Sequence, residues 1–310
     1  MILTLTLNPG LDRTYFIDEF RWNKTLRSTR TAVGMGGKAI DASWILSELG
    51  YANTALGFAA GSVGRQMEEM LRGHGAKTDF VWVQGETRTN LVLVSRAGAG
   101  QTTVTGGGLE IKPEQVRELV EKYRRSVKGS GCVILGGSVP PGVHPARYAE
   151  LVRIARTAGV PVVFDASGSG LAAGLSSGPT VVKPNKDELE QLSGKKIAGL
   201  RSAYLAARGL QEKYGATFIV TLGRQGALAV LPERAYRIPP LMLDVVSAAG
   251  AGDAVLAGLA AALSQRKPLE DGLRLGFAAA AAVCLTPATA DCRRADVEAF
   301  LPRIRLLPYP

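Results

Sequence analysis

The sequence predicts an α/β fold with a mostly parallel central sheet, helices on both of its faces and a small β-sheet lid. Apolar, β-rich runs alternate with helical stretches along most of the chain, which is the pattern of successive βαβ units. Two stretches, at about residues 12–35 and 87–106, contain strand-like runs with no helix between them. The 310 residues, 46% of them hydrophobic, suffice for one domain over residues 1–310 with a large core.

The alternation is clearest in the second half of the chain. Apolar runs that are typical of strands are CVILGG (132–137), PVVFDA (161–166), TVVKPN (180–185) and TFIVTLG (217–223). Helices are expected at residues 39–49, near 144–158, in DELEQL (187–192), and near 199–214, 252–265 and 270–285. Ligands of such sheets bind beyond the carboxyl ends of the strands, so we expect the polar loops that follow these strands to share one edge.

The two stretches without helices predict four strands of a separate small sheet. The second stretch has the pattern of a hairpin around Ala97–Gly100. A sheet face that no helix covers has to be buried against something else. The small sheet is therefore expected to serve as a lid over a site, or as an interface with another subunit.

Composition and charge exclude several classes of protein. The longest apolar run, residues 277–285, is too short to span a bilayer, and the first ten residues alternate like a strand and lack the features of a signal peptide. The three cysteines form no C-x-x-C pair, which favours a reducing cytoplasm. The net charge of +10 comes from scattered Lys and Arg, so no nucleic acid is expected as partner, although such a field concentrates small anions.

Several well-known catalytic motifs do not occur in the sequence. There is no P-loop, no G-x-G-x-x-G fingerprint and no protein-kinase motif set. Ser138 lies in Gly-Gly-Ser-Val-Pro and not in a nucleophile elbow. The only histidines, His74 and His144, have unlike contexts, which argues against a histidine-based metal site or triad.

The most informative motif is Ser-Ala-Ala-Gly-Ala-Gly-Asp at residues 247–253, at the start of a helix-forming run. Gly250, Ala251 and Gly252 allow a ligand to approach the first N–H groups of that helix, which suit a phosphate. Asp253 is then placed to take a proton from a hydroxyl that attacks the phosphate. The alternative is that Asp253 only caps the helix.

Glycines and charged residues near the N-terminus form a second group of candidates. Gly36, Gly37 and Lys38 connect a strand-like segment to the helix at 39–49, and they suit either an anion site or a solvated turn. Asp12 follows a turn, where it accepts hydrogen bonds from sugar hydroxyls or stabilises the turn itself.

Arginines and a polar helix start form a third group. Arg27 and Arg88 lie in the two lid segments, and the planar guanidinium suits a terminal phosphate, although isolated surface arginines are common. Asn185 and Glu188 have the spacing of a capping box, or they order the water shell of Mg²⁺ on a nucleotide. The loop at 221–226 suits either a hairpin turn or a nucleotide.

Together these segments resemble the PfkB carbohydrate kinases of the ribokinase-like fold over essentially the whole chain. The matching motifs, in order, are NPGLD (8–12), GMGGK (34–38), TRTN (87–90), GGSVPPG (136–142), KPNKDE (183–188), TLGRQG (221–226) and AGAGD (249–253). NPGLD, GGK and TRTN are most similar to the phosphosugar branch of the family, which contains 1-phosphofructokinase, tagatose-6-phosphate kinase and the minor 6-phosphofructokinase.

The resemblance implies a role for each matching position. Asp253 would be the catalytic base, and Gly250, Ala251 and Gly252 would form the anion hole for the transferred phosphoryl group. The residues implied to contact the sugar phosphate are Asp12, Arg27, Gly36, Gly37, Lys38, Asp41, Arg88 and Ser138. The residues implied to lie along ATP are Lys183, Asn185, Thr221, Gly223 and Gly226, with Asn185 and Glu188 organising Mg²⁺ through water. The family's lid, often shared across a dimer, implies a homodimer.

The implied reaction is in-line attack of a ketohexose phosphate on ATP, with fructose 1-phosphate ahead of tagatose 6-phosphate and fructose 6-phosphate. The alternatives are a kinase of a non-phosphorylated sugar or nucleoside, and a non-catalytic sensor of sugar phosphate or nucleotide.

Four positions depart from the family pattern: Ala39 replaces a glycine, Asp41 an asparagine, Ala249 a threonine and Ala254 a serine. These changes leave the base and the anion hole intact and bear on the choice of substrate.

Overall fold

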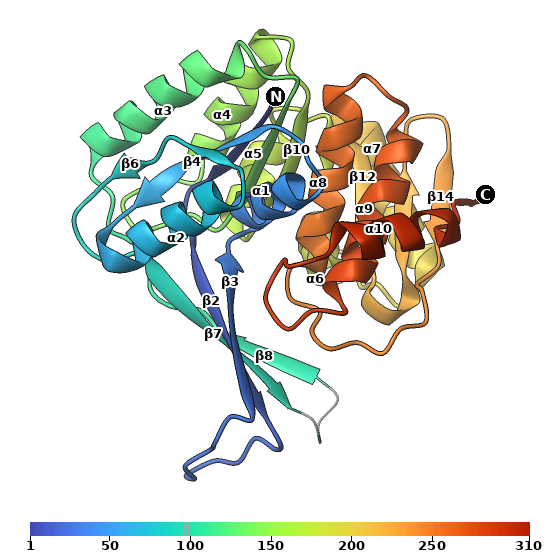
Figure 1. Cartoon of the computed structure of the whole chain (residues 1–310). Helices are drawn as coiled ribbons and strands as arrows, with labels where there is room; N and C mark the ends of the chain where they lie inside the picture. The colour runs from blue at the N-terminus through green and yellow to red at the C-terminus, as the bar shows by residue number, and fades with distance from the viewer. Residues whose placement is uncertain (96, 98–99) are drawn as a thin grey trace.

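The central sheet in the computed structural model, which describes residues 1–95, 97 and 100–310, runs through the whole main body (Figure 1). Its strands, in spatial order, are β15 (Leu307–Pro308), β14 (Ala235–Ile238), β13 (Ala227–Val230), β12 (Thr217–Thr221), β11 (Val181–Val182), β10 (Val162–Ala166), β9 (Cys132–Gly137), β1 (Ile2–Thr6), β4 (Asn53–Ala59) and β5 (Lys77–Thr78), and β6 (Val81–Trp82) also pairs with β4. All neighbours from β12 to β5 and β6 are parallel, and β12 to β15 are antiparallel. The prediction of a mostly parallel sheet is confirmed.

Helices cover both faces of this sheet, because its side chains alternate between two apolar clusters. Leu3 and Leu5 of β1 join the cluster on one face, whereas Ile2 joins the cluster on the other. The first face is covered by α3 (Pro113–Val127), α4 (Arg147–Thr157), α5 (Ser169–Leu175), α6 (Lys186–Ser193) and α7 (Leu200–Tyr214). The second is covered by α1 (Lys38–Glu48), α8 (Ala251–Ser264), α9 (Leu269–Val283) and α10 (Arg294–Phe300), and α2 (Gly61–Gly73) packs in a third cluster with β4.

Helices α8 and α9 pack with their backbones in direct contact. A Cβ atom built on Gly258 of α8 would overlap the backbone of Gly276 in α9. A Cβ built on Gly276 would in turn lie 2.9 Å from the backbone of Val255. Only residues without side chains allow this approach, so the pair of helices has no room for adjustment along the contact.

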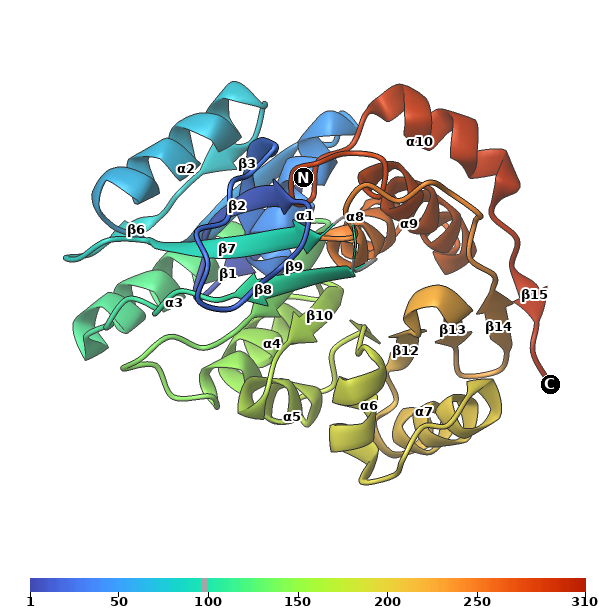
Figure 2. The same cartoon turned by 90° about the horizontal axis from the view of Figure 1, so that it is seen from below.

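A second sheet of four strands projects from the main body (Figures 1 and 2). Its order is β3 (Arg30–Gly36), β2 (Gly10–Ile17), β7 (Arg88–Ser95) and β8 (Gly100–Val104). The four strands predicted without intervening helices are therefore confirmed. The turn expected around Ala97–Gly100 includes residues 98 and 99, which lie outside the described residues.

Two details differ from the sequence-based expectations. The strand expected at residues 180–185 is only two residues long, because Pro184 has no N–H to continue the ladder. The helix expected from residue 144 begins at Arg147, after a turn in which the Arg147 N–H donates to the His144 carbonyl. Among the described residues, no helix combines the length and apolar character needed to cross a membrane.

Candidate active site

The polar loops after the strands of the central sheet meet at one edge, as expected. Asn8, after β1, donates from Nδ2 to Oγ of Ser138, after β9, at 3.1 Å. Asn185, after β11, forms an isolated parallel bridge with Thr221 at the end of β12. These contacts bring together segments that lie up to 130 residues apart in the chain, and they define the edge where the candidate residues gather.

The first turn of α8 lies at this edge and is left open. Its N-cap is Gly250, with a left-handed φ of 83°, and a Cβ at that position would overlap the backbone of Ala290. No side chain caps the helix, so the alternative that Asp253 is its cap is wrong. The Ala251 and Asp253 N–H groups donate to the carbonyls of Ala248 and Gly250. The remaining first-turn N–H groups and the positive end of the helix dipole suit an anion.

Asp253 is half-buried in this first turn and has the electrostatic setting of a base. Burial raises the pKa of Asp253 to about 7, and Lys183 and Lys38 limit the rise while Asp165 adds to it. A carboxylate with a pKa near the ambient pH is well matched to accept a proton from a hydroxyl. The setting fits the role implied for Asp253.

Asp41, in the first turn of α1, lies against Asp253. Its Oδ2 accepts a hydrogen bond from the Gly37 N–H at 3.3 Å, and the two carboxyl groups are within hydrogen-bond reach of each other. Burial, followed by the charges of Asp253 and Asp12, raises the pKa of Asp41 well above its usual value. Asp41 therefore belongs to the same group as the candidate base.

Asp12, on β2, is held by residues from two other parts of the chain. Its Oδ1 accepts from Asn90 Nδ2 at 2.7 Å, and its Oδ2 accepts from Thr289 Oγ1 at 2.8 Å. A Cβ on Gly36 would overlap Oδ1 of Asp12, so only glycine fits at position 36 without displacing that carboxylate. Burial raises the pKa of Asp12 against the effect of both hydrogen bonds. Thr289 was missed from the sequence because nothing local marks a contact 277 residues away.

Arg88, at the start of β7, is half-buried beside these acids. Its Nε is buried and has no hydrogen-bond partner among the described residues. Burial lowers the pKa of Arg88, and the nearby Asp12 and Asp41 oppose that shift. A guanidinium nitrogen without a partner is a costly group to bury, and an anionic ligand supplies the partner it lacks.

Asp165, at the end of β10, organises the lysines of the site and was missed in the sequence analysis. It is fully buried, and its two oxygens lie 2.5 Å from Lys38 Nζ and 2.6 Å from Lys183 Nζ. Burial alone favours the neutral acid, but the two ammonium groups outweigh it and hold the pKa of Asp165 below its usual value. A carboxylate inside the apolar run PVVFDA is the signal that could have revealed it, because a buried charge needs a partner.

The two lysines occupy different places at the site. Lys183 Nζ is 3.3 Å from the point where a Cβ on Gly252 would lie, so its charge sits beside the first turn of α8. Lys38 pairs with Glu188 at 2.9 Å as well as with Asp165. Its ammonium is therefore directed to the capping box at the start of α6, and its implied contact with the sugar phosphate stays a prediction.

Asn185 and Glu188 form the capping box that their spacing predicts. The Glu188 N–H donates to Asn185 Oδ1, and the Asn185 N–H donates to Glu188 Oε2, both at 2.9 Å. The loop with Gly223 and Gly226 is a hairpin turn between β12 and β13, and a Cβ on Gly226 would overlap the carbonyl of Ile238. Both structural interpretations are thus confirmed, and the roles implied toward Mg²⁺ and ATP stay predictions.

Arg27 is not among the candidate residues that the structure brings together. It is exposed and belongs to the segment between β2 and β3, which forms the end of the small sheet remote from the main body (Figure 1).

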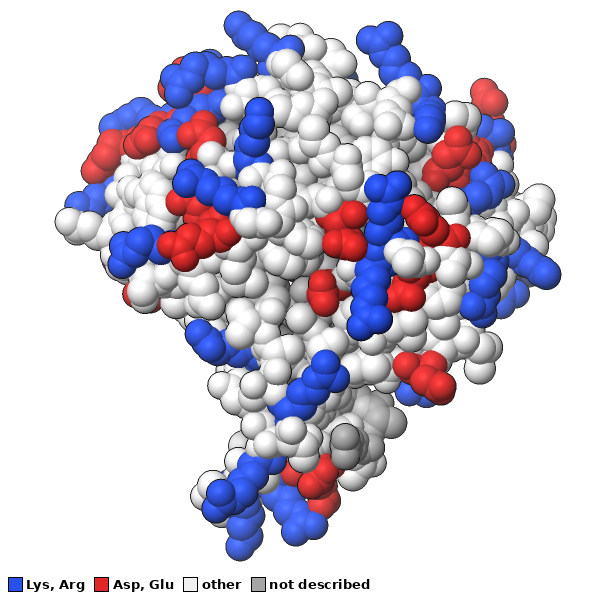
Figure 3. All heavy atoms as spheres, viewed as in Figure 1, with Lys and Arg blue, Asp and Glu red and all other residues white. Residues whose placement is uncertain are grey.

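Over the face in Figure 3, Lys and Arg are interspersed with Asp and Glu on the main body. The scattered charge expected from the sequence is seen on this face.

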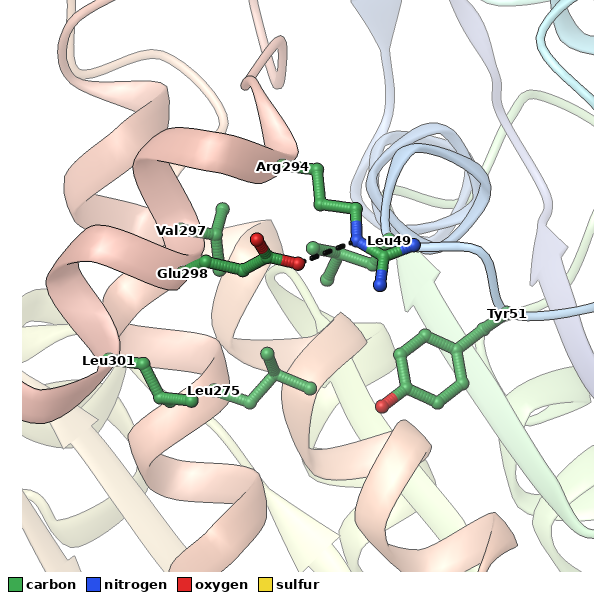
Figure 4. Close-up of a pocket in the computed structure, with 7 residues that line it drawn as sticks. All are labelled: Leu49, Tyr51, Leu275, Arg294, Val297, Glu298 and Leu301. Atoms are coloured by element: carbon green, nitrogen blue, oxygen red, sulfur yellow. Dashed lines mark hydrogen bonds and ion pairs between the residues drawn. The ribbon is translucent and has the colours of Figure 1, made fainter.

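One pocket of the structure lies outside this group of residues (Figure 4). It has a volume of about 110 Å³ and lies between the end of α1, α9 and α10. Its lining residues are Leu49, Tyr51, Leu275, Arg294, Val297, Glu298 and Leu301. Its two charged residues, Arg294 and Glu298, pair with each other at 2.8 Å, and none of the candidate residues lines it. It is not the candidate site.

Comparison with known proteins matches the chain to one family. Residues 11–296 match the pfkB family of carbohydrate kinases. The chain is 34% identical to tagatose-6-phosphate kinase of Staphylococcus epidermidis over 278 residues, which is 88% of this chain and 89% of that protein. It is 31% identical to 1-phosphofructokinase of Bacillus subtilis over 286 residues, with coverage of 92% and 93%.

The solved structures agree with this match. The crystal structure of phosphofructokinase-2 from Escherichia coli in complex with substrates and products has a TM-score of 0.89 and 29% identity, and it covers 97% of this chain and 98% of that chain. The ribokinase-like α/β fold implied by the resemblance is thereby confirmed. The relatives are kinases, the family uses ATP, and the match extends over nearly the whole chain. The chain belongs to the pfkB family of carbohydrate kinases and is a kinase.

Proposed function

We propose that this kinase transfers the γ-phosphoryl group of ATP to a hydroxyl of a ketohexose phosphate, with fructose 1-phosphate as the first candidate. The observation that supports a phosphorylated acceptor is the buried Nε of Arg88, which has no hydrogen-bond partner among the described residues. The charges of Asp12 and Asp41 act on the Arg88 guanidinium and oppose the lowering of its pKa by burial. The names of the relatives, tagatose-6-phosphate kinase and 1-phosphofructokinase, support the same class of acceptor.

The proposed mechanism relies on positioning and on charge. The γ-phosphoryl group lies against the first turn of α8, where Gly250 and Gly252 present backbone N–H groups, while the Ala251 N–H donates to the Ala248 carbonyl at 3.3 Å. Lys183, whose ammonium is beside Gly252, neutralises charge that develops on the transferred group. Asp253 accepts the proton of the attacking hydroxyl as the oxygen–phosphorus bond forms and the bond to ADP breaks. Holding the reactants in line accounts for much of the acceleration.

The acceptor side of the site is assigned to the residues at the base of the small sheet. Asp12 is already oriented by Asn90 and Thr289, so its remaining lone pairs can accept hydrogen bonds from sugar hydroxyls. Arg88 binds the existing phosphate, together with Ser138, whose hydroxyl is oriented by Asn8. A side chain at Gly36 would overlap Asp12, and one at Gly37 would press against Thr6 and Pro9, so neither position has room for one.

Magnesium fits this edge as a companion of ATP. Among the described residues, no three His, Cys, Asp or Glu side chains are grouped to hold a metal ion. The carboxylate of Glu188 and the amide of Asn185 already accept hydrogen bonds, so they suit contact with the water ligands of the ion, which Mg²⁺ retains readily. When bound with ATP, Mg²⁺ neutralises charge on the β- and γ-phosphates.

We also propose that two chains associate through the small sheet. Trp22 is 81% exposed and packs edge-on against the half-exposed Phe20, with ring centroids 5.0 Å apart, and Val104 of β8 is 55% exposed. Apolar side chains at such exposure, on β8 and on the segment between β2 and β3, are better explained by a second copy. Association there would also bring Arg27 toward another chain. Light scattering should give twice 32.6 kDa, and the monomer mass would overturn the dimer.

The acceptor assignment is tested by an ADP-release screen. The panel is fructose 1-phosphate, fructose 6-phosphate, tagatose 6-phosphate, fructose and a set of nucleosides, each with ATP and Mg²⁺. Rapid turnover of a ketohexose phosphate is expected. Efficient turnover of fructose or a nucleoside alone would replace the phosphosugar assignment, and ATP binding without turnover of any acceptor would favour a sensor.

A further inference from the structure

The side chain of Asp41 is buried with one oxygen lacking a donor. Only 4% of the residue is exposed, and its Oδ2 accepts from the Gly37 N–H at 3.3 Å. The other oxygen, Oδ1, is buried and has no hydrogen-bond donor among the described residues. A buried carboxylate oxygen without a donor is unstable as an anion, and protonation of that oxygen removes the problem.

The neighbour of this carboxyl group is a second one, that of Asp253. The two side chains, from the first turns of α1 and α8, are within hydrogen-bond reach of each other. Two ionised carboxylates in contact repel strongly when water is largely excluded, so such pairs retain one proton between them. The same proton gives the pair its hydrogen bond.

The surrounding charges decide which of the two groups holds the proton. Asp253 faces the ammonium groups of Lys183 and Lys38, which stabilise its negative charge, with Asp165 between them. Asp41 faces the carboxyl groups of Asp253 and Asp12, and Arg88 is its cation. The negative charge is therefore more stable on Asp253, and the proton is more stable on Asp41.

We propose that Asp41 is a neutral acid that donates a hydrogen bond from Oδ1 to the carboxylate of Asp253, and that it positions the base for the proposed phosphoryl transfer. The inference rests on the role of Asp253 as base. Asp41 keeps its proton through the reaction, while Asp253 accepts the proton of the acceptor hydroxyl. Activity then requires the singly protonated pair, so it falls when Asp253 is protonated at low pH and when Asp41 ionises at high pH.

The test is the pH profile of kcat/KM for the wild type and for Asp41→Asn, measured with whichever acceptor the ADP-release screen identifies. The amide of asparagine donates the same hydrogen bond but cannot ionise. The variant is expected to retain activity at neutral pH within about threefold, to keep the acid limb within about 0.3 pH units, and to lose the alkaline limb. Asp41→Ala, which removes the donor, is expected to shift the acid limb upward and to lower kcat.

Other outcomes would overturn the proposal. A downward shift of the acid limb by about one unit in Asp41→Asn would mean that Asp41 is ionised in the active enzyme. Profiles with the same two limbs in wild type and Asp41→Asn would mean that Asp41 has only a structural role. So would equal losses at every pH in both variants, once thermal unfolding shows that they are folded.

A spectroscopic measurement separates this inference from the proposed function. The infrared spectrum of the enzyme without substrates, recorded about two pH units above the acid limb and below the alkaline limb, should contain a protonated-carboxyl C=O stretch that Asp41→Asn abolishes, because Asp253 is ionised there. Asp12→Asn, which removes a carboxyl whose two oxygens already accept hydrogen bonds, should keep that band. A wild type without the band overturns the proton-bearing pair, whereas the band persists whether or not a sugar phosphate proves to be the acceptor.

Discussion

The ammonium of Lys183 lies 2.6 Å from the carboxylate of Asp165, which is completely buried at the end of β10. Asp165 in turn holds Lys38 on its other oxygen. One acidic side chain thus fixes two cations at the edge where the first turn of α8 begins. Charges held in place before the reaction need no reorganisation during it, which is the main electrostatic advantage of an enzyme site over water.

Replacement of the candidate base tests the chemistry directly. Asp253→Asn is expected to reduce kcat by about 10²–10⁴-fold, because an amide cannot accept the hydroxyl proton, while ATP still binds. Steady-state kinetics and calorimetric titration with ATP measure the two effects. Asp244→Asn, at an exposed position before the same helix, is the control and should be unchanged. Full activity of Asp253→Asn would exclude Asp253 as base.

Removal of the unpaired guanidinium tests the phosphate subsite. Arg88→Ala is expected to raise KM for a phosphorylated acceptor by about 10–100-fold, the loss expected for one charge-assisted contact, and to leave KM for ATP nearly unchanged. Arg201→Ala, at an exposed position of α7, serves as control. If KM for the acceptor stays the same in Arg88→Ala, another residue binds the phosphate.

Loss of the central carboxylate should weaken the fold as well as the site. Asp165→Asn leaves two lysines without their shared partner, and breaking a buried ion pair in this way costs about 3–5 kcal/mol in the free energy of unfolding. Asp79→Asn removes a 2.5 Å ion pair with Lys122 in which Asp79 is 44% exposed, and it should cost less than about 1 kcal/mol. Urea denaturation compares the two variants, and equal losses would contradict this account.

The contact between α8 and α9 predicts opposite effects for two glycine substitutions. Gly258→Ala places a methyl group against the backbone of Gly276 and should lower the free energy of unfolding by about 1–3 kcal/mol. Gly209→Ala, in α7 with nothing within 4 Å of the new Cβ, should raise it by about 0.5–1 kcal/mol. Thermal denaturation of both variants checks the signs, and a stabilised Gly258→Ala would show that the helices can separate.

The parts of the site that follow from local pattern were predictable from the sequence, and those that depend on distant contacts were not. Gly250 and Asp253 stand out because a glycine turn before a helix has a recognisable composition, and the capping box of Asn185 and Glu188 has a fixed spacing. Asp165 looked like one residue of an apolar strand, since its partners, Lys38 and Lys183, come from other elements. The long-range contact of Thr289 with Asp12 was invisible for the same reason.

The prediction for Arg27 shows a different limit. Its place between two strands of the small sheet was correctly inferred, because the residues on either side of it alternate as strands do. Where that segment points depends on how far β2 and β3 extend from the main body, and strand patterns do not encode this distance. The role proposed for Arg27 would therefore depend on the proposed association of two chains.

The glycine contact between α8 and α9 has a consequence for the order of events in the catalytic cycle. Backbones that touch cannot slide or rotate past each other, so the two helices move as one rigid body and the turn proposed to bind phosphate keeps its place on the central sheet. Any closure around bound reactants must then come from the opposite side. The acceptor would be carried toward an immobile nucleotide, and product release would depend on the small sheet withdrawing.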